Sequence, residues 1–123
     1  MENNAFRDAL KLLRMARNKF TPFLNSHYEI HEWKHASAIL MQDFPAEWKE
    51  IVEVLTRFRF NKSWITVGGG SKSKVAQAVD SQLYDLGWEE KQFATHVVVD
   101  DRQMDSPTHK IDCFKNRVAL EIE

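Results

Sequence analysis

The stretch PTHKIDCFKNRVALEIE, residues 107–123, decides how this sequence is expected to fold. Asn116-Arg117 predicts a two-residue hairpin loop, because Asn tolerates the positive φ that such loops require. The loop would join a strand over residues 108–115 to a strand over residues 118–123. Moving away from the loop, the predicted pairs are Lys115 with Val118, Phe114 with Ala119, Cys113 with Leu120, Asp112 with Glu121, Ile111 with Ile122, and Lys110 with Glu123.

This register separates the side chains of the hairpin by polarity, because successive residues of a strand point to opposite faces of the sheet. The apolar face holds Ile111, Cys113, Val118, Leu120 and Ile122. The other face places Asp112 opposite Glu121, with Glu123 two residues further along. Like charges that face each other destabilise a hairpin, so a bound cation is expected to offset them. Oxygen ligands suit a hard ion such as Mg²⁺, which commonly also binds a substrate phosphate.

A plainer interpretation of the same acids stays open at this point. Antiparallel sheets often have one solvated face, on which Asp112, Glu121 and Glu123 would simply be solubilising residues. Lys110 would then pair with Glu123 as a surface salt bridge that contributes little to stability. Spacing alone favours neither interpretation.

The sequence upstream of the hairpin is mainly helical in pattern. Apolar residues at helical spacing predict helices over about residues 4–19, 27–42, 45–58 and 75–86. A capping box of Ser26 and Glu29 would start the second helix, and Pro45 would lie in the first turn of the third. Gly87 would end the fourth helix.

The remaining segments predict strands and turns, so the expected fold class is α+β. Residues 63–67 and 93–100 are expected to be strands, and residues 101–107 have the composition of a turn. The expected architecture is a helical part, residues 1–62, followed by a β part, residues 63–123. An antiparallel meander would form from the strands over residues 93–100, 108–115 and 118–123.

Composition indicates an ordinary globular protein. The chain has 123 residues, of which 43% are hydrophobic, so a single domain spanning residues 1–123 is expected. A net charge of -1 gives no global electrostatic argument for binding nucleic acid or a membrane. One cysteine, no secretory signal and no long uncharged run predict a soluble cytoplasmic protein. The tryptophans are expected in the core or at packing edges: Trp33, Trp48, Trp64 and Trp88.

His31-Glu32-Trp33-Lys34-His35 matches H-E-x-x-H, the signature of a zinc metallopeptidase. On a helix, His31 and His35 would bind zinc on one face and Glu32 would act as the base. The charged Lys34 inside the motif argues against this alternative, because such helices are normally buried. An edge of polar histidines beside an apolar stripe is the plainer interpretation.

The segment Gly68-Gly69-Gly70-Ser71-Lys72-Ser73-Lys74 would follow a strand and open a helix, as phosphate-binding loops do. Its spacing does not match the nucleotide-binding P-loop. Backbone N–H groups and two lysines suit contact with DNA phosphates, and a flexible solvated turn is the alternative. The candidate DNA contacts are Ser71, Lys72, Ser73 and Lys74, with Lys110 of the hairpin as a further one.

Residues 107–123 also resemble the active-site hairpin of the PD-(D/E)xK nucleases, in which an Asp on one strand precedes E-x-E or E-x-Q on the next. Within that superfamily the stretch is most similar to type II restriction endonucleases of the BglII and BamHI kind. Residues 28–60 resemble the helical part of these enzymes. The pre-catalytic part is similar at Gly68, Gly69, Gly70, Ser73, Asp80, Leu83, Gly87 and Trp88.

The resemblance implies Mg²⁺-dependent hydrolysis of phosphodiester bonds in double-stranded DNA by a homodimer. Asp112 and Glu121 would be metal ligands. Glu123 would join them at the position where most of the superfamily has a catalytic Lys. A carboxylate there would act as a general base or orient the attacking water. A non-catalytic DNA-binding module with the same fold is the third hypothesis.

The resemblance also implies a truncated core. The family fold continues beyond the catalytic strand with a helix and at least one further strand, whereas this sequence ends at Glu123. A fragment that holds the metal ligands but lacks full activity is therefore expected.

Overall fold

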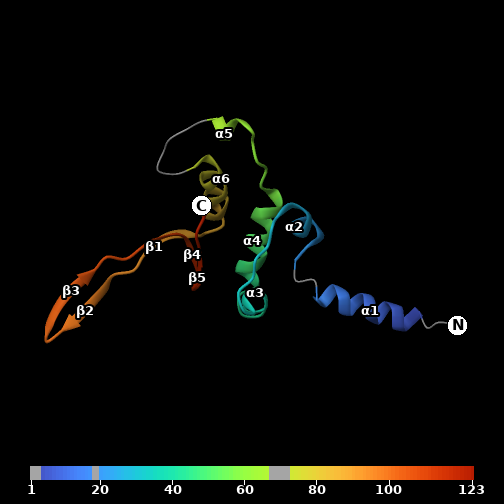
Figure 1. The fold of residues 1–123 in the computed structure, drawn as a ribbon, viewed down its shortest axis with the longest axis horizontal. Helices are drawn as coiled ribbons and strands as arrows, with labels where there is room; N and C mark the ends of the chain where they lie inside the picture. The colour runs from blue at the N-terminus through green and yellow to red at the C-terminus, as the bar shows by residue number, and fades with distance from the viewer. Residues whose placement is uncertain (1–3, 18–19, 67–72) are drawn as a thin grey trace. The chain divides into compact units, whose positions relative to one another are not determined.

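A computed structural model of the chain describes residues 4–17, 20–66 and 73–123. It confirms a mixed α+β fold in which helices come first and strands lie toward the C-terminus (Figure 1). The helices are α1 (Asn4–Arg17), α2 (Pro22–His27), α3 (Ala36–Asp43), α4 (Pro45–Arg57), α5 (Ser63–Thr66) and α6 (Lys74–Asp85). The strands are β1 (Glu89–Gln92), β2 (Thr95–Val99), β3 (Arg102–Ser106), β4 (Lys110–Lys115) and β5 (Val118–Leu120).

The chain forms two compact units, Met1–Trp48 and Lys49–Glu123. The first contains α1, α2, α3 and the start of α4, and the second contains the rest of α4 and everything after it. All residues proposed for nuclease chemistry or DNA contact lie in the second unit. The expectation of one domain over residues 1–123 stays a prediction.

In the first unit, the predicted helix over residues 27–42 is wrong, because two shorter helices, α2 and α3, are found instead. Pro22 begins α2, and the Thr21 hydroxyl caps that helix by accepting a hydrogen bond from Leu24 N at 3.3 Å. The helix therefore starts before the predicted capping box, and the Ser26 hydroxyl donates to the carbonyl of Phe23 instead. Residues 28–35 are not helical, and the next helix, α3, begins at Ala36.

In the second unit, the predicted strand over residues 63–67 is wrong where the structure describes it. Ser63–Thr66 forms the short helix α5. The side-chain oxygen of Asn61 accepts a hydrogen bond from Ser63 N at 3.0 Å, which satisfies a backbone donor at the start of this turn. Local capping therefore outweighs the β-propensity of Trp64 and Ile65. By contrast, the helices expected at Pro45 and before Gly87 are present, and Gly87 has the positive φ of a helix terminator, 91°.

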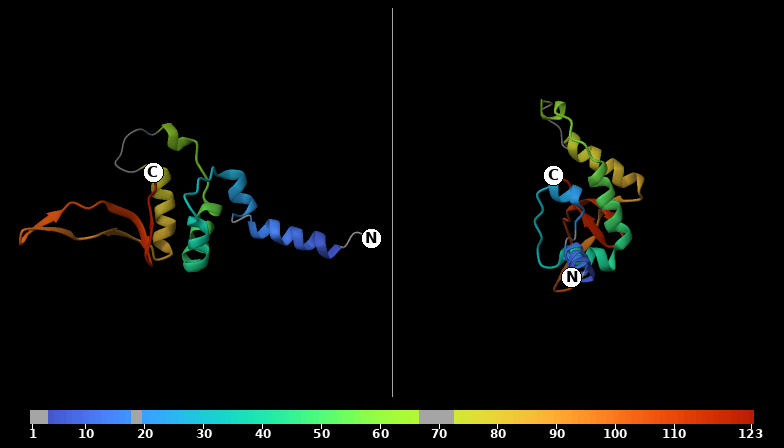
Figure 2. Two further views of the ribbon diagram at one scale, coloured as in Figure 1. Left: turned by 60° about the horizontal axis from the view of Figure 1, so that its bottom comes forward. Right: turned by 90° about the vertical axis from the view of Figure 1, so that its right-hand side faces the viewer.

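The strands form two sheets rather than one meander. A three-stranded antiparallel sheet has the order β1-β4-β5, and β2 and β3 form a separate two-stranded hairpin. The residues predicted as one long turn, 101–107, contain β3, because the chain reverses at Asp100 and Asp101 with φ of 47° and 63°. Figures 1 and 2 show this hairpin extending away from the ends of β1 and β4.

Helix α6 packs beside β4 and supplies much of the buried core of the second unit (Figure 2). The Ser73 hydroxyl caps its N-terminus by accepting from Ala76 N at 3.0 Å. The core includes Ala76, Val79 and Leu83 of α6, Trp88, and Cys113 and Val118 of the hairpin. This packing fixes one face of β4 against the helix and leaves the other face for the candidate site.

One polar network joins α4 to the sheet. Lys115 Nζ donates to Glu50 Oε1 at 2.8 Å and to the Leu86 carbonyl at 2.7 Å. Trp88 Nε1 donates to Glu50 Oε2 at 2.8 Å. Glu50 therefore neutralises a lysine that strand alternation directs to the apolar face, and it satisfies a buried indole N–H.

Replacing Glu50 by Ala is expected to lower the free energy of unfolding by about 1–3 kcal/mol, because it leaves Lys115 and Trp88 without this acceptor. Urea unfolding followed by circular dichroism measures the change. The control is Glu53→Ala on the same helix, whose ion pair with Arg57 is exposed and should contribute less than about 0.5 kcal/mol. Equal losses in the two variants would contradict the structural role of Glu50.

Candidate active site

The hairpin of β4 and β5 has the loop and register expected from the sequence. Asn116 and Arg117 have positive φ values of 45° and 68°, as a two-residue loop requires. The paired residues are Cys113 with Leu120, Phe114 with Ala119, and Lys115 with Val118. Cys113 and Val118 are buried, as predicted for the apolar face, whereas Ile111, Leu120 and Ile122 are only partly buried.

Asp112 lies on the opposite face and is held from two sides. Strand β5 ends at Leu120, so the ladder does not extend to the pairs predicted beyond it. In place of a ladder bond, Ile122 N donates to Asp112 Oδ2 at 3.0 Å. Tyr84 of α6 donates its hydroxyl to the Asp112 carbonyl at 3.0 Å. The Asp112 side chain is thereby tied to the segment that carries Glu121 and Glu123.

Glu121 and Glu123 flank the Ile122 amide that binds Asp112, and both are exposed. His109 Nε2 lies 3.1 Å from Glu121 Oε1. Sequence reasoning missed His109, because strand alternation would place it on the face opposite Asp112. His109 precedes the first residue of β4, so the alternation of side chains along the strand does not determine where its side chain points.

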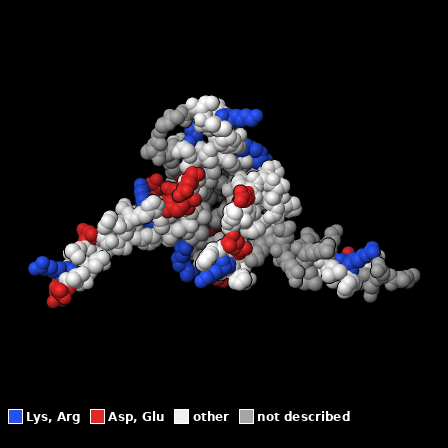
Figure 3. Space-filling view, viewed as in Figure 1, with Lys and Arg blue, Asp and Glu red and all other residues white. Residues whose placement is uncertain are grey.

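Lys110 has a different partner from the one predicted. Its Nζ lies 2.6 Å from Glu90 Oε2 on the neighbouring strand β1, and its backbone partner is Gln92. The expected ion pair with Glu123 is therefore corrected, because the sequence did not reveal β1 as the other neighbour of β4. Figure 3 shows acidic side chains gathered on the visible face close to where Figure 1 places the C-terminus.

The sequence predicted that the carboxylates of Asp112, Glu121 and Glu123 converge on one metal ion, and the described residues do not form such a three-ligand site. Across residues 4–17, 20–66 and 73–123, the structure has no group of three or more His, Cys, Asp or Glu side chains placed to hold a metal ion. The donor chemistry nevertheless fits Mg²⁺, which is commonly bound by one or two carboxylates together with waters and substrate phosphates. Asp112 and Glu121 are the candidates for two such carboxylates, and the backbone N–H of Ile122, the residue after Glu121, donates to Asp112 Oδ2 at 3.0 Å.

The candidate phosphate-binding loop is described only in part. Gly68, Gly69, Gly70, Ser71 and Lys72 lie outside the described residues. Ser73 and Lys74 are exposed at the start of α6, where the Ser73 hydroxyl caps the helix. Their contact with DNA stays a prediction.

The H-E-x-x-H interpretation is wrong, because His31 and His35 do not lie on one helix. Residues 31–35 are irregular, and Lys34 has a φ of 45°. Glu32 accepts a hydrogen bond from Ser37 N at 2.9 Å, and His31 Nε2 lies 2.8 Å from Glu29 Oε1. The motif instead provides a cap at the start of α3, so the helical geometry that a zinc peptidase needs is not formed.

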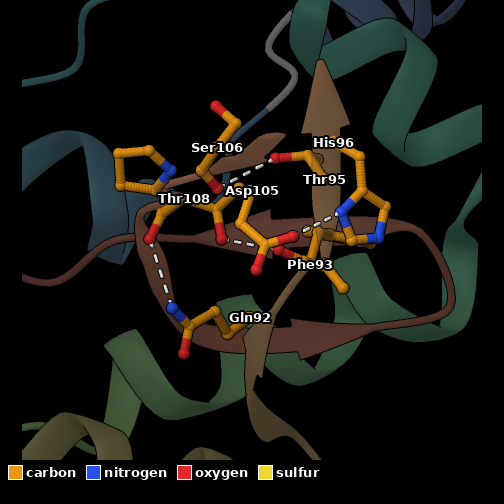
Figure 4. A pocket seen from close by; sticks show the side chains of 9 residues that line it. Gln92, Phe93, Thr95, His96, Asp105, Ser106 and Thr108 are labelled. Atoms are coloured by element: carbon orange, nitrogen blue, oxygen red, sulfur yellow. Dashed lines mark hydrogen bonds and ion pairs between the residues drawn. The ribbon is translucent and has the colours of Figure 1, made fainter. Parts of the chain in front are cut away.

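A pocket of about 390 Å³ lies at the base of the β2–β3 hairpin (Figure 4). His96 Nδ1 lies 2.8 Å from Asp105 Oδ1 across the two strands, and Thr95 Oγ1 donates to the Ser106 carbonyl at 3.3 Å. Gln92 Nε2 donates to the Thr108 carbonyl at 3.4 Å. These polar groups form hydrogen bonds with one another and stabilise the base of the hairpin. Because they already have partners, the pocket is a weaker candidate site than the face around Asp112.

Comparison with known families identifies the chain. The sequence model of the restriction endonuclease BglII/BglIII family matches residues 28–123, which include the whole β4–β5 hairpin. The chain belongs to the BglII/BglIII family of restriction endonucleases. No curated protein and no solved structure matches the chain.

Membership in the BglII/BglIII family makes this protein a type II site-specific deoxyribonuclease, with double-stranded DNA as its partner. Restriction endonucleases of this kind generally use divalent metal ions. Among the residues that the structure describes, no helix is both long and apolar enough to cross a membrane.

Proposed function

We propose that this BglII/BglIII-family enzyme hydrolyses phosphodiester bonds in double-stranded DNA with Mg²⁺ as its cofactor. Asp112 and Glu121 are the proposed ligands. The observation that carries the proposal is the hydrogen bond from Ile122 N to Asp112 Oδ2, which ties the Asp of β4 to the segment holding the E-x-E pair. When bound, Mg²⁺ supplies positive charge that neutralises the phosphate and stabilises the leaving oxygen.

The protein's own groups would position the reactants. Tyr84 of α6 donates to the backbone carbonyl of Asp112 and fixes its main chain, and the Ile122 amide donates to its carboxylate and orients the side chain. Glu123 is exposed, follows Ile122 directly, and would accept the proton of the attacking water as a general base. The water oxygen forms a bond to phosphorus, one ester bond breaks, and the released oxygen takes a proton from solvent.

The DNA backbone is proposed to contact Ser71, Lys72, Ser73, Lys74 and Lys110. The hydroxyl of Ser73 is engaged by the helix, and Lys110 is paired with Glu90, so any contact there competes with an existing one. The lysines would attract phosphates without reading the base sequence.

The proposed assembly is a homodimer, in which residues 1–123 of each copy belong to one restriction-endonuclease-like domain. A two-fold symmetric dimer matches a palindromic DNA site, because each copy meets the same half-site. Light scattering after gel filtration, with and without DNA, measures the mass. A monomer under both conditions would overturn this part of the proposal.

Cleavage of plasmid DNA by the purified protein tests the proposed cofactor. Added Mg²⁺ should convert supercoiled plasmid to defined linear fragments, and EDTA should stop the reaction, because the ion stabilises the developing charge. Cleavage that persists in EDTA would contradict the proposal. Salt-sensitive DNA binding with no cleavage in any divalent metal would instead indicate the non-catalytic module.

A further inference from the structure

His109 contacts the acidic residue whose position the sheet does not fix. Strand β5 ends at Leu120, one residue before Glu121, so ladder hydrogen bonds do not hold Glu121 in place. His109 Nε2 lies 3.1 Å from Glu121 Oε1. The two residues are well separated in sequence, but β4 and β5 bring the segment before β4 next to the segment after β5.

We propose that His109 is a positioning residue that orients the Glu121 carboxylate for binding a divalent metal ion. This inference rests on the proposed function, in which Glu121 is a ligand. The contact engages Oε1 and restricts the rotation of the side chain, so Oε2 is presented in one direction. A partner that orients a metal-binding side chain typically contributes roughly 10- to 100-fold to metal affinity or activity.

The contact between His109 and Glu121 also allows a second role for His109, which predicts the opposite effect on metal binding. A histidine that simply neutralises a surface acid would compete with a metal ion for the same carboxylate. Removing it would then strengthen metal binding. If His109 orients Glu121, removing it weakens metal binding, because the flexible carboxylate must be ordered when the ion arrives. The two roles therefore predict opposite signs.

The chain offers a matched control in a second histidine-carboxylate pair. His96 Nδ1 lies 2.8 Å from Asp105 Oδ1 on the β2–β3 hairpin, and both side chains are exposed. The His109 side chain is 78% exposed, so its replacement should not disturb folding. His96→Ala removes a similar surface pair from residues that have no proposed role in catalysis.

The experiment measures the binding of Mn²⁺ alone to the purified protein by isothermal titration calorimetry. His109→Ala should raise the dissociation constant about tenfold. His109→Gln retains an N–H donor of similar reach and should stay within about threefold of the unchanged protein, while His96→Ala should have no effect. An unchanged or lower dissociation constant in His109→Ala would overturn the inference.

Cleavage kinetics provide a second readout. In His109→Ala, the Mg²⁺ concentration giving half the maximal rate should rise about tenfold, and the rate at saturating Mg²⁺ should be largely retained. A lower saturating rate with an unchanged midpoint would argue against a positioning role.

Asp112→Asn separates the two proposals in the same titration. If this variant binds Mn²⁺ as well as the unchanged protein, the proposed metal site itself is wrong. If Asp112→Asn weakens binding and His109→Ala does not, the site stands and the role of His109 is rejected.

Discussion

Asp112→Asn and Glu121→Gln should each reduce the cleavage of double-stranded DNA by at least about a hundredfold. Both substitutions keep the shape of the side chain and remove the negative charge that the proposed ion requires. In Asp112→Asn, the Ile122 amide can still donate to the oxygen of the new side-chain amide, so the hairpin should remain folded. Initial rates on plasmid DNA at saturating Mg²⁺ measure the effect.

A matched control is Glu89→Gln, which removes an exposed carboxylate from β1 of the same sheet. This variant should cleave within about twofold of the unchanged protein, because surface charges away from a site contribute little. If either Asp112→Asn or Glu121→Gln cleaves DNA at the rate of the unchanged protein, the assignment of these two residues is wrong.

Trp88→Ala should lower the free energy of unfolding by about 3–5 kcal/mol. The Trp88 side chain follows α6, is only 1% exposed and donates its indole N–H to Glu50 at 2.8 Å. Its removal leaves a large cavity and takes one of the hydrogen bonds from the Glu50 carboxylate, which keeps those from Lys115, and the surrounding core can collapse only in part. Urea unfolding followed by far-ultraviolet circular dichroism measures the loss.

Two further tryptophan variants separate the effect of the lost hydrogen bond from that of the lost core packing. Trp88→Phe keeps an aromatic ring but loses the indole N–H, so its cost should be about 1–2 kcal/mol. Trp33 is 80% exposed, and Trp33→Ala should change the free energy of unfolding by less than about 0.5 kcal/mol. A Trp88→Ala variant as stable as Trp33→Ala would contradict the burial of Trp88 in the core.

The sequence-based predictions that the structure confirms rest on residues that are close together in the sequence. The loop at Asn116 and Arg117 and the pairing of Cys113 with Leu120 follow from turn chemistry and strand alternation within a short stretch. Pro45 and Gly87 likewise mark helix ends through their own backbone preferences. The family resemblance rested on this same hairpin and was confirmed over residues 28–123.

The predictions that failed concerned which segments pair. The valines of β2 indicated a strand correctly, but β-propensity does not say which strand it pairs with, and β2 joins β3 in a separate exposed hairpin. The neighbour of β4 is instead β1, a polar segment whose four residues are all exposed. Strand formation there depends on the hydrogen bonds that β4 offers, which the sequence of β1 does not reveal.

The amino-acid sequence by itself determined the α+β class, the hairpin register and the family, because these depend on local periodicity, turn residues and a contiguous motif. Only the tertiary structure decided the partners of the polar side chains: Glu50 with Lys115 and Trp88, Lys110 with Glu90, and Glu121 with His109. Each of these contacts joins residues from separate segments. Their distances depend on how whole elements pack, which local sequence patterns do not encode.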